Sequence, residues 1–280
     1  GQEATALYKY QWDLIHNPKS VWFSWLKEEE EGMAIVSLSK KLNSEQINKL
    51  NSSIQRLLNK SFIFSHIYKI YIDNTNAKEE YEFSIYDGFK LETGGEIIIL
   101  PCSYNLSCKG DAKYKVNILI RPEIFNDEKN IDATLYEEIF HCGQAIYYGI
   151  VMNNSGWYNI NQNWLIYETE VKIAKAFSGI TSEGIENYLV NWAKDEIVKK
   201  YFEKIRNQTV IDTLLEKQFR DKVADLAMKI FYLYKIRRNN YEKEKFLYKE
   251  NIENSNEFID FKSKLFSTPY FEALSKMYVK

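Results

Sequence analysis

Alternating apolar and polar residues predict strands in the first half of the chain. The alternation covers 68–72, 81–86 and 114–120, and a short apolar run at 96–100 is closed by Pro101. Successive side chains of a strand point to opposite faces, so a period of two is typical of half-buried strands. We therefore expect three or four strands with short connections, forming a small mixed or antiparallel sheet.

Apolar residues three and four positions apart predict helices on both sides of this region. Before it, 44–59 has one apolar face, and Ser44 is placed to cap the helix. After it, the chain is expected to be almost wholly helical, because no proline occurs between residues 123 and 268 to interrupt it. The expected helices are 132–149, 162–178, 182–205, 208–236 and a last segment within 255–280.

Strands followed by helices predict an α+β fold. We expect a single domain over 1–280, with a helical or irregular part at 1–60, a β-rich part at 61–125 and a helical part at 126–280. Apolar residues make up 45% of the chain, enough for a substantial core. The formal net charge of −2 excludes a strongly basic nucleic-acid surface, and no apolar run is long enough for a membrane span.

The candidate chemistry lies on the predicted helix 132–149. The run EEIFH at 137–141 places Glu137 and His141 four residues apart, so they are neighbours on one helix face. Two histidines at this spacing hold zinc in the HExxH motif, and the glutamate after the first one, here Glu138, is the general base. The alternative is a helix with an acidic first half and one hydrogen-bonded core histidine.

A second candidate residue lies on the predicted helix 162–178. Glu170 falls in the middle of the apolar stripe of this helix, where a carboxylate needs a partner. Glu168 falls on the opposite side, beside Lys172 and Lys175, and is expected to be solvated. Glu170 is therefore predicted to join Glu137, Glu138 and His141 in one cluster. A buried salt bridge to Arg or Lys is the alternative for Glu170.

At these two stretches the chain resembles zincin-like metallopeptidases that combine an HExxH helix with a downstream glutamate. The pattern has a helix reading HExxHxxQ and then a helix reading ExEA. Here they read EEIFHCGQ at 137–144 and ETEV at 168–171, so Val171 stands where the pattern has alanine. The resemblance covers roughly 95–180. It implies a small sheet followed by the active helix and then the glutamate helix.

Carried over by position, the resemblance makes His141 and Glu170 metal ligands and Glu138 the general base. Glu137 stands where the first histidine ligand belongs. If Glu137 binds the metal itself, the Glu/His/Glu set is harder than His₂Glu and accepts manganese, iron or calcium more readily than the zinc motif does. If no metal binds, the fold serves as a binding or structural module.

The resemblance therefore implies a metallopeptidase-related protein in which peptide-bond hydrolysis is weak or lost. It would take zinc or another divalent metal and a protein or peptide substrate or ligand. The alternative is a secreted, non-catalytic binding or structural protein that retains the fold.

The cysteines and the first residue bear on the compartment. Cys102 and Cys108 bracket a short loop and either pair or remain free thiols, whereas Cys142 is expected to be a packing residue. The chain begins with Gly1 rather than methionine, which is expected of a trimmed chain. We expect a secreted, periplasmic or cell-surface protein.

Overall fold

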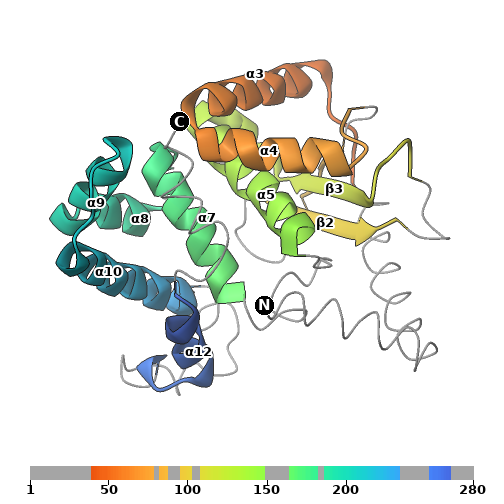
Figure 1. Ribbon diagram of the computed structural model, residues 1–280. Coiled ribbons are helices and arrows are strands. Elements are labelled where there is room, and N and C mark those ends of the chain that lie inside the picture. The colour runs from red at the N-terminus through yellow and green to blue at the C-terminus, as the bar shows by residue number, and fades with distance from the viewer. Residues whose placement is uncertain are drawn as a thin grey trace, which may run out of the picture. The chain divides into compact units, whose positions relative to one another are not determined.

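The protein has an α+β fold in which helices predominate over one small sheet (Figure 1). This confirms the α+β class predicted from the sequence, and a zincin-like core stays a prediction. The computed structural model describes residues 39–78, 82–87, 95–102, 108–148, 164–181, 186–233 and 252–265. Its elements are α3 Ser44–Lys60, α4 Phe62–Asn74, β1 Phe83–Ile85, β2 Gly95–Pro101, β3 Tyr114–Ile120, the 3-10 helix η1 Pro122–Asn126, α5 Glu128–Tyr148, α7 Trp164–Ser178, α8 Asn187–Ala193, α9 Glu196–Arg206, α10 Thr213–Phe231 and α12 Asn256–Lys264.

The chain divides into two compact units. The first contains Gly1–Asn59 and Phe64–Asn161, and the second contains Lys60–Ile63 and Gln162–Lys280. The first unit holds the sheet and α5, and the second holds α7 and the helices after it. The single domain predicted for 1–280, with parts at 1–60, 61–125 and 126–280, stays a prediction.

The sheet has three described strands in the order β1-β3-β2. β1 runs parallel to β3, with Phe83 beside Ile118, and β2 runs antiparallel to β3, with Ile97 beside the same Ile118. The sheet is therefore mixed, one of the two predicted forms. The strands expected at 96–100 and 114–120 are confirmed as β2 and β3. The strand expected at 81–86 is present as the shorter β1, and its first position lies outside the described residues.

The strand predicted at 68–72 is wrong, because these residues belong to the helix α4. The buried residues Ile63, Phe64, Ile67 and Tyr71 recur at helical spacing. The alternation over 68–72 lies within this longer pattern and does not mark a strand.

The helix α3 begins with a reciprocal cap centred on Asn43. The Asn43 side-chain oxygen accepts from the Gln46 amide at 2.8 Å, and the Gln46 side-chain oxygen accepts from the Asn43 amide at 3.0 Å. Both bonds satisfy amides that have no partner within the helix. The predicted helix 44–59 is confirmed, but Asn43 takes the capping role that was predicted for Ser44.

In the first unit, α5 packs against β2 and is tied to α3 at its own first turns. Asp132 of α5 accepts hydrogen bonds from the Arg56 guanidinium at 2.7 and 3.1 Å and from the Ser53 hydroxyl. A planar guanidinium that binds both oxygens of one carboxylate fixes orientation as well as distance. These contacts attach the first turns of α5 to α3.

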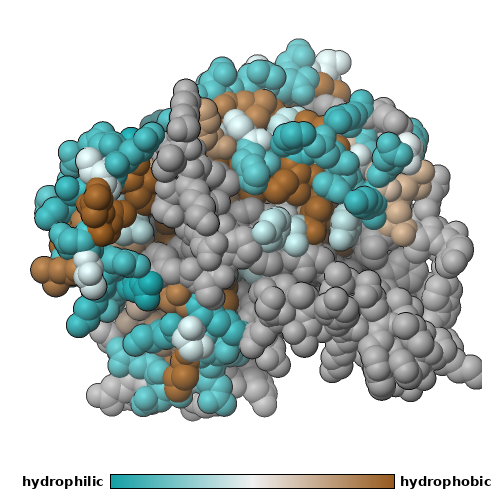
Figure 2. All heavy atoms as spheres, in the orientation of Figure 1, coloured by the Kyte–Doolittle hydropathy of each residue, from teal (hydrophilic) through white to brown (hydrophobic). Residues whose placement is uncertain are grey.

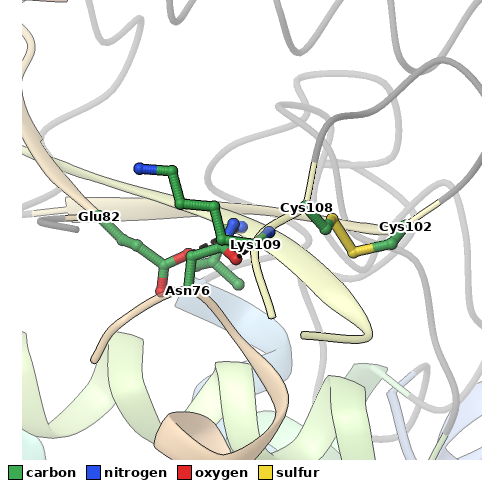
Figure 3. The surroundings of a disulfide bond; sticks show 6 residues. Asn76, Glu82, Cys102, Cys108 and Lys109 are labelled. Carbon is green, nitrogen blue, oxygen red and sulfur yellow. Dashed lines mark hydrogen bonds between the residues drawn. A yellow bond between two sulfur atoms is a disulfide. The ribbon is translucent and has the colours of Figure 1, made fainter. Parts of the chain in front are cut away.

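A disulfide between Cys102 and Cys108 closes the connection from β2 toward β3 (Figure 3). The sequence left this pairing open. The backbone beside the disulfide is held by α4 and the turn after it. Lys109 donates its amide to the Asn76 side chain at 2.9 Å, and Lys113 donates its amide to the Asn74 carbonyl at 2.9 Å. The closed loop is therefore anchored to the end of α4.

In the second unit, the end of α7 is defined by glycine. Gly179 has φ +66°, a backbone conformation that glycine adopts without strain. Its amide donates to the Ala176 carbonyl at 3.2 Å, and the Ile180 amide donates to the Lys175 carbonyl at 2.9 Å. These two bonds are the Schellman arrangement that satisfies the last carbonyls of a helix. The predicted helix 162–178 is thus confirmed as α7 from Trp164 onward, and its first two positions lie outside the described residues.

The helix predicted at 182–205 is two helices, α8 and α9. Asp195 separates them, because its carboxylate accepts from the amides of Ile197 at 2.8 Å and Val198 at 3.4 Å and so begins a new helix. The predicted helices at 208–236 and within 255–280 are present as α10, which begins at Thr213, and as α12. Positions 234–236 and 266–280 lie outside the described residues. Aromatic side chains contact one another in this unit: Phe177, Trp192, Tyr201, Phe202 and Phe219.

Hydrophilic residues cover much of the visible face of the described helices, with apolar residues between them (Figure 2). Within the described ranges, no helix has the length and apolar character needed to cross a bilayer.

Candidate metal centre

The α5 helix carries the candidate residues on a largely buried surface. It begins at Glu128, four residues before the predicted start, and all of its side chains from Glu138 to Ala145 are buried. The apolar residues Leu135, Cys142 and Ala145 of this helix are in the core. Ionisable groups on this helix therefore lie in surroundings where a charge needs a partner.

Glu137 and His141 lie beside each other one helical turn apart, as the spacing predicts. The carboxylate oxygen Oε1 of Glu137 is 4.0 Å from Nε2 of His141. The His141 side chain is 6% exposed and the Glu137 side chain 16%. This separation exceeds the roughly 2.7–3.2 Å of an N–H···O hydrogen bond. The two atoms are potential ligands on one face of α5.

The other nitrogen of His141 faces the side chain of Gln144. The Gln144 oxygen Oε1 is 2.8 Å from Nδ1, and Gln144 is fully buried. The two ring nitrogens therefore differ in their surroundings, with an amide on one side and a carboxylate on the other. The sequence contained Gln144 at the last position of the HExxHxxQ pattern, but spacing alone gave it no role.

Glu138 lies against the start of β2. A Cβ added at Gly95 would be 3.1 Å from Cγ of Glu138 and 3.1 Å from the Leu119 carbonyl. The absence of a side chain at Gly95 is what lets the strand and this glutamate approach so closely. Glu138 is buried, so the predicted base lies between α5 and the sheet rather than in open solvent.

A second buried glutamate, Glu82, belongs to the same region and was not predicted. Its carboxylate accepts from the Tyr71 hydroxyl at 3.0 Å and from the Val116 amide at 3.3 Å. Burial raises the pKa of the Cys142 thiol well above its usual value, and the charges of Glu82 and Glu138 raise it further. A thiol held neutral in this way is a poor nucleophile, as expected of a packing residue.

In the second unit, α7 is buried on every side. Glu168 is 5% exposed and Glu170 is 2% exposed. The prediction that Glu168 is solvated is therefore wrong, and so is the reason for preferring Glu170 over it. An amphipathic pattern predicts one exposed face, but the ends of charged side chains can also be buried when they meet opposite charges.

The lysines of α7 meet such a charge. The ammonium groups of Lys172 and Lys175 are 3.1 and 2.6 Å from the same Glu186 oxygen. Each lysine side chain is 1% exposed, and that of Glu186 is 8% exposed. The two lysines were expected on a solvated face and instead form a buried ion-pair cluster, here called the lysine pair of α7.

Among the side chains that the structure describes, Glu137, His141 and Glu168 form a group that could hold a metal ion. Two members are predicted ligands, and the third is the α7 glutamate that sequence reasoning rejected. Glu170 stays a predicted ligand. His66, the other described histidine, is exposed on α4, and His16 lies outside the described residues.

Comparisons with family models, with curated proteins and with solved structures find no match to this chain. The candidate centre therefore rests on the residues and contacts described above.

Proposed function

We propose that this protein is a zincin-like, metallopeptidase-related protein that binds a divalent metal ion and in which peptide-bond hydrolysis is weak or lost. The observation that carries the proposal is the arrangement on α5, where Glu137 Oε1 and His141 Nε2 share one face at 4.0 Å. The order of elements, with a small sheet, then α5 and then α7, agrees with the fold that the resemblance implies.

The proposed ligands are Glu137, His141 and one glutamate of α7. Glu168 is the first choice, because it belongs to the group that could hold an ion, and Glu170 is the choice made from the sequence. Two carboxylates and one imidazole form a harder donor set than the His₂Glu set of zinc peptidases. We therefore expect the preference for zinc over manganese to be smaller at this site than at a His₂Glu site.

The proposed chemistry is hydrolysis of a protein or peptide, with the activity reduced by Glu137. A bound divalent ion would supply a Lewis acid that polarises a carbonyl group. Glu138 would accept a proton from water on its carboxylate. A second carboxylate ligand adds negative charge at the ion and so lowers its Lewis acidity.

The ligand set is tested by a matched pair of variants on α7. Glu168→Gln and Glu170→Gln each replace a buried carboxylate with an amide of the same shape, two residues apart on one helix. Metal content after loading with Zn²⁺ or Mn²⁺ and gel filtration is measured by mass spectrometry. We expect about one ion per wild-type chain, loss of the ion in Glu168→Gln and in His141→Ala, and retention in Glu170→Gln.

Two other results have clear meanings. Loss of the ion in Glu170→Gln but not in Glu168→Gln would identify Glu170, the residue predicted from the sequence, as the ligand. Wild-type protein that takes up neither ion would contradict the metal site.

The alternative function is a non-catalytic binding or structural protein that retains the peptidase-like fold. It is favoured by the presence of Glu137 where a histidine is required. Glu137→His separates the two, since it restores the motif without altering Glu138 or His141. Cleavage of a general peptide mixture by this variant, and its loss in Glu137→His combined with Glu138→Gln, would favour a peptidase ancestry with an intact base.

We also propose a secreted, periplasmic or cell-surface location. The support is the Cys102–Cys108 disulfide, since disulfides persist mainly in oxidising compartments. Trapping free thiols with iodoacetamide in freshly lysed cells of the source, followed by mass spectrometry, tests it. Alkylated Cys102 and Cys108 would contradict this location.

A further inference from the structure

We propose that Gln144 is a positioning residue, which holds the proton of His141 on Nδ1 and so leaves Nε2 as the nitrogen that faces Glu137. This inference deepens the proposed metal site and rests on it. It starts from a contact within α5 alone, where Gln144 Oε1 lies 2.8 Å from His141 Nδ1.

The chemistry of the amide decides which atom carries the proton. The oxygen of a glutamine side chain can only accept a hydrogen bond. In a neutral imidazole one nitrogen donates and the other accepts, so a donor at Nδ1 leaves the lone pair on Nε2. Gln144 is fully buried and lies one turn along the helix from His141, so the contact is made in the protein interior.

On the other side of the ring, the Glu137 carboxylate is too far for a direct hydrogen bond and is nearer to the spacing of two metal ligands. Zinc lies about 2.0–2.1 Å from a histidine nitrogen and about 2.0–2.2 Å from a carboxylate oxygen, so two ligand atoms are roughly 3.4 Å apart at a tetrahedral angle and at most about 4.2 Å apart. The observed 4.0 Å between His141 Nε2 and Glu137 Oε1 exceeds the tetrahedral separation by about 0.6 Å, so the two side chains would move slightly closer when they bind an ion. A hydrogen bond at that distance would be too long.

A purely structural role for Gln144 predicts something different. In that case the amide only provides a hydrogen-bond partner for a buried ring. It can do so through its oxygen or through its NH₂ group, so either ring nitrogen can carry the proton. Metal-binding histidines instead commonly donate their second N–H to an oxygen, which fixes both tautomer and ring orientation. The tautomer of His141 therefore distinguishes the two roles without any metal being present.

The test measures the tautomer first and the metal affinity second. Protein labelled with ¹⁵N is examined, metal-free, by long-range ¹H–¹⁵N correlation of its histidine rings at about pH 8.5, roughly two units above the usual histidine pKa. The chain has three histidines, and His141→Gln identifies the signal of interest. We expect the Nδ1–H tautomer in the wild type and in Gln144→Glu, which keeps an accepting oxygen, and a mixture in Gln144→Met, which keeps only the shape.

Zn²⁺ affinity provides the second readout. By analogy with other residues that orient metal ligands, Gln144→Met is expected to weaken zinc binding about 10–100-fold, and Gln144→Glu to weaken it less. Circular dichroism and the melting temperature of each variant show whether the fold is retained.

The outcomes separate this inference from the proposed function. An Nε2–H tautomer in the wild type overturns the role of Gln144, as does a Gln144→Met variant with unchanged tautomer. Absence of Zn²⁺ and Mn²⁺ binding in the wild type overturns the proposed function instead, and the tautomer of the metal-free protein still decides what Gln144 does.

Discussion

Both α5 and α7 carry glutamates in buried or nearly buried positions, but the groups that lie near these helices differ. On α7 the nearby charges include two ammonium groups that converge on Glu186 at 3.1 and 2.6 Å. On α5 the neighbours of Glu137 include His141, at 4.0 Å, and His141 in turn contacts the amide of Gln144. Lysine is ordinarily positively charged at physiological pH, whereas imidazole is neutral or charged according to pH and can bind a metal.

This difference separates a structural use of buried charge from a chemical one. A buried carboxylate beside two lysines is neutralised at all physiological pH values, and removing one partner leaves an uncompensated charge. A carboxylate beside a neutral imidazole keeps its charge available for an ion. The comparison predicts that the lysine pair of α7 stabilises the fold, whereas the Glu137–His141 pair of α5 provides a site at a cost in stability.

The largest expected effect comes from breaking the lysine pair of α7. Glu186→Gln leaves two buried ammonium groups facing a neutral amide and is expected to lower the free energy of unfolding by about 3 kcal/mol. Urea unfolding followed by circular dichroism measures it. Glu196→Gln is the matched control, because Glu196 pairs with Lys199 at 3.7 Å on the surface and its side chain is 91% exposed. Equal unfolding midpoints for the two variants would contradict the view that the buried ion pairs of α7 stabilise the fold more than an exposed pair does.

On α5, a substitution at the point of contact with α4 tests how tightly the helix is packed. A Cβ at Gly143 would lie 2.5 Å from Cγ2 of Ile67 on α4, a branched side chain that cannot easily move away. Overpacking costs about 1–3 kcal/mol, while replacing a helical glycine by alanine recovers up to about 1 kcal/mol. Gly143→Ala is therefore expected to destabilise the protein by about 1 kcal/mol.

The contact between position 143 and Ile67 can be tested from the other side. Ile67→Leu removes the branch that Gly143→Ala would contact while keeping the volume. In a double-mutant cycle the two changes together should be less harmful than the sum of the single changes. Additive effects would show that α5 and α4 are less closely packed at this point than the structure indicates.

Sequence reasoning succeeded where one local pattern decided the structure. β3 and α3 were located within one residue because their apolar periods are unbroken, and α5 was identified with its start placed late. The strand expected at 68–72 failed because five alternating residues also fit a helix when its buried positions extend beyond them. The break at Asp195 had a visible signal, since aspartate is a preferred helix cap.

The candidate site was predictable on α5 and much less so on α7. Spacing alone places Glu137 and His141 on one face, since both are on the same helix. The choice between Glu168 and Glu170 depends on which faces of α7 are buried, and that depends on tertiary structure. Periodicity assigned Lys172 and Lys175 to solvent because it cannot foresee Glu186, which is in a different element.

The smallest expected effect concerns the ion pair between Asp195 and Lys222, which lies outside both α5 and α7. It measures how much a partly exposed charge contributes to the free energy of unfolding. Burial alone would raise the pKa of Asp195, but hydrogen bonds from Lys222 and from the Ile197 and Val198 amides lower the pKa below its usual value. Because the folded pKa is the lower one, the stabilisation is present above about pH 4, the usual aspartate pKa, and is lost as pH falls through the folded value.

Asp195→Asn should therefore flatten the loss of stability below about pH 4 while keeping the cap of α9. The expected change at neutral pH is below about 1 kcal/mol, because the side chains of Asp195 and Lys222 are 29% and 34% exposed and solvent screens their interaction. Urea midpoints at several pH values between about 2.5 and 7 measure it, with Lys222→Met as the second variant. A larger effect than that of Glu186→Gln would mean that exposed pairs, rather than the buried charges of α7, stabilise this unit.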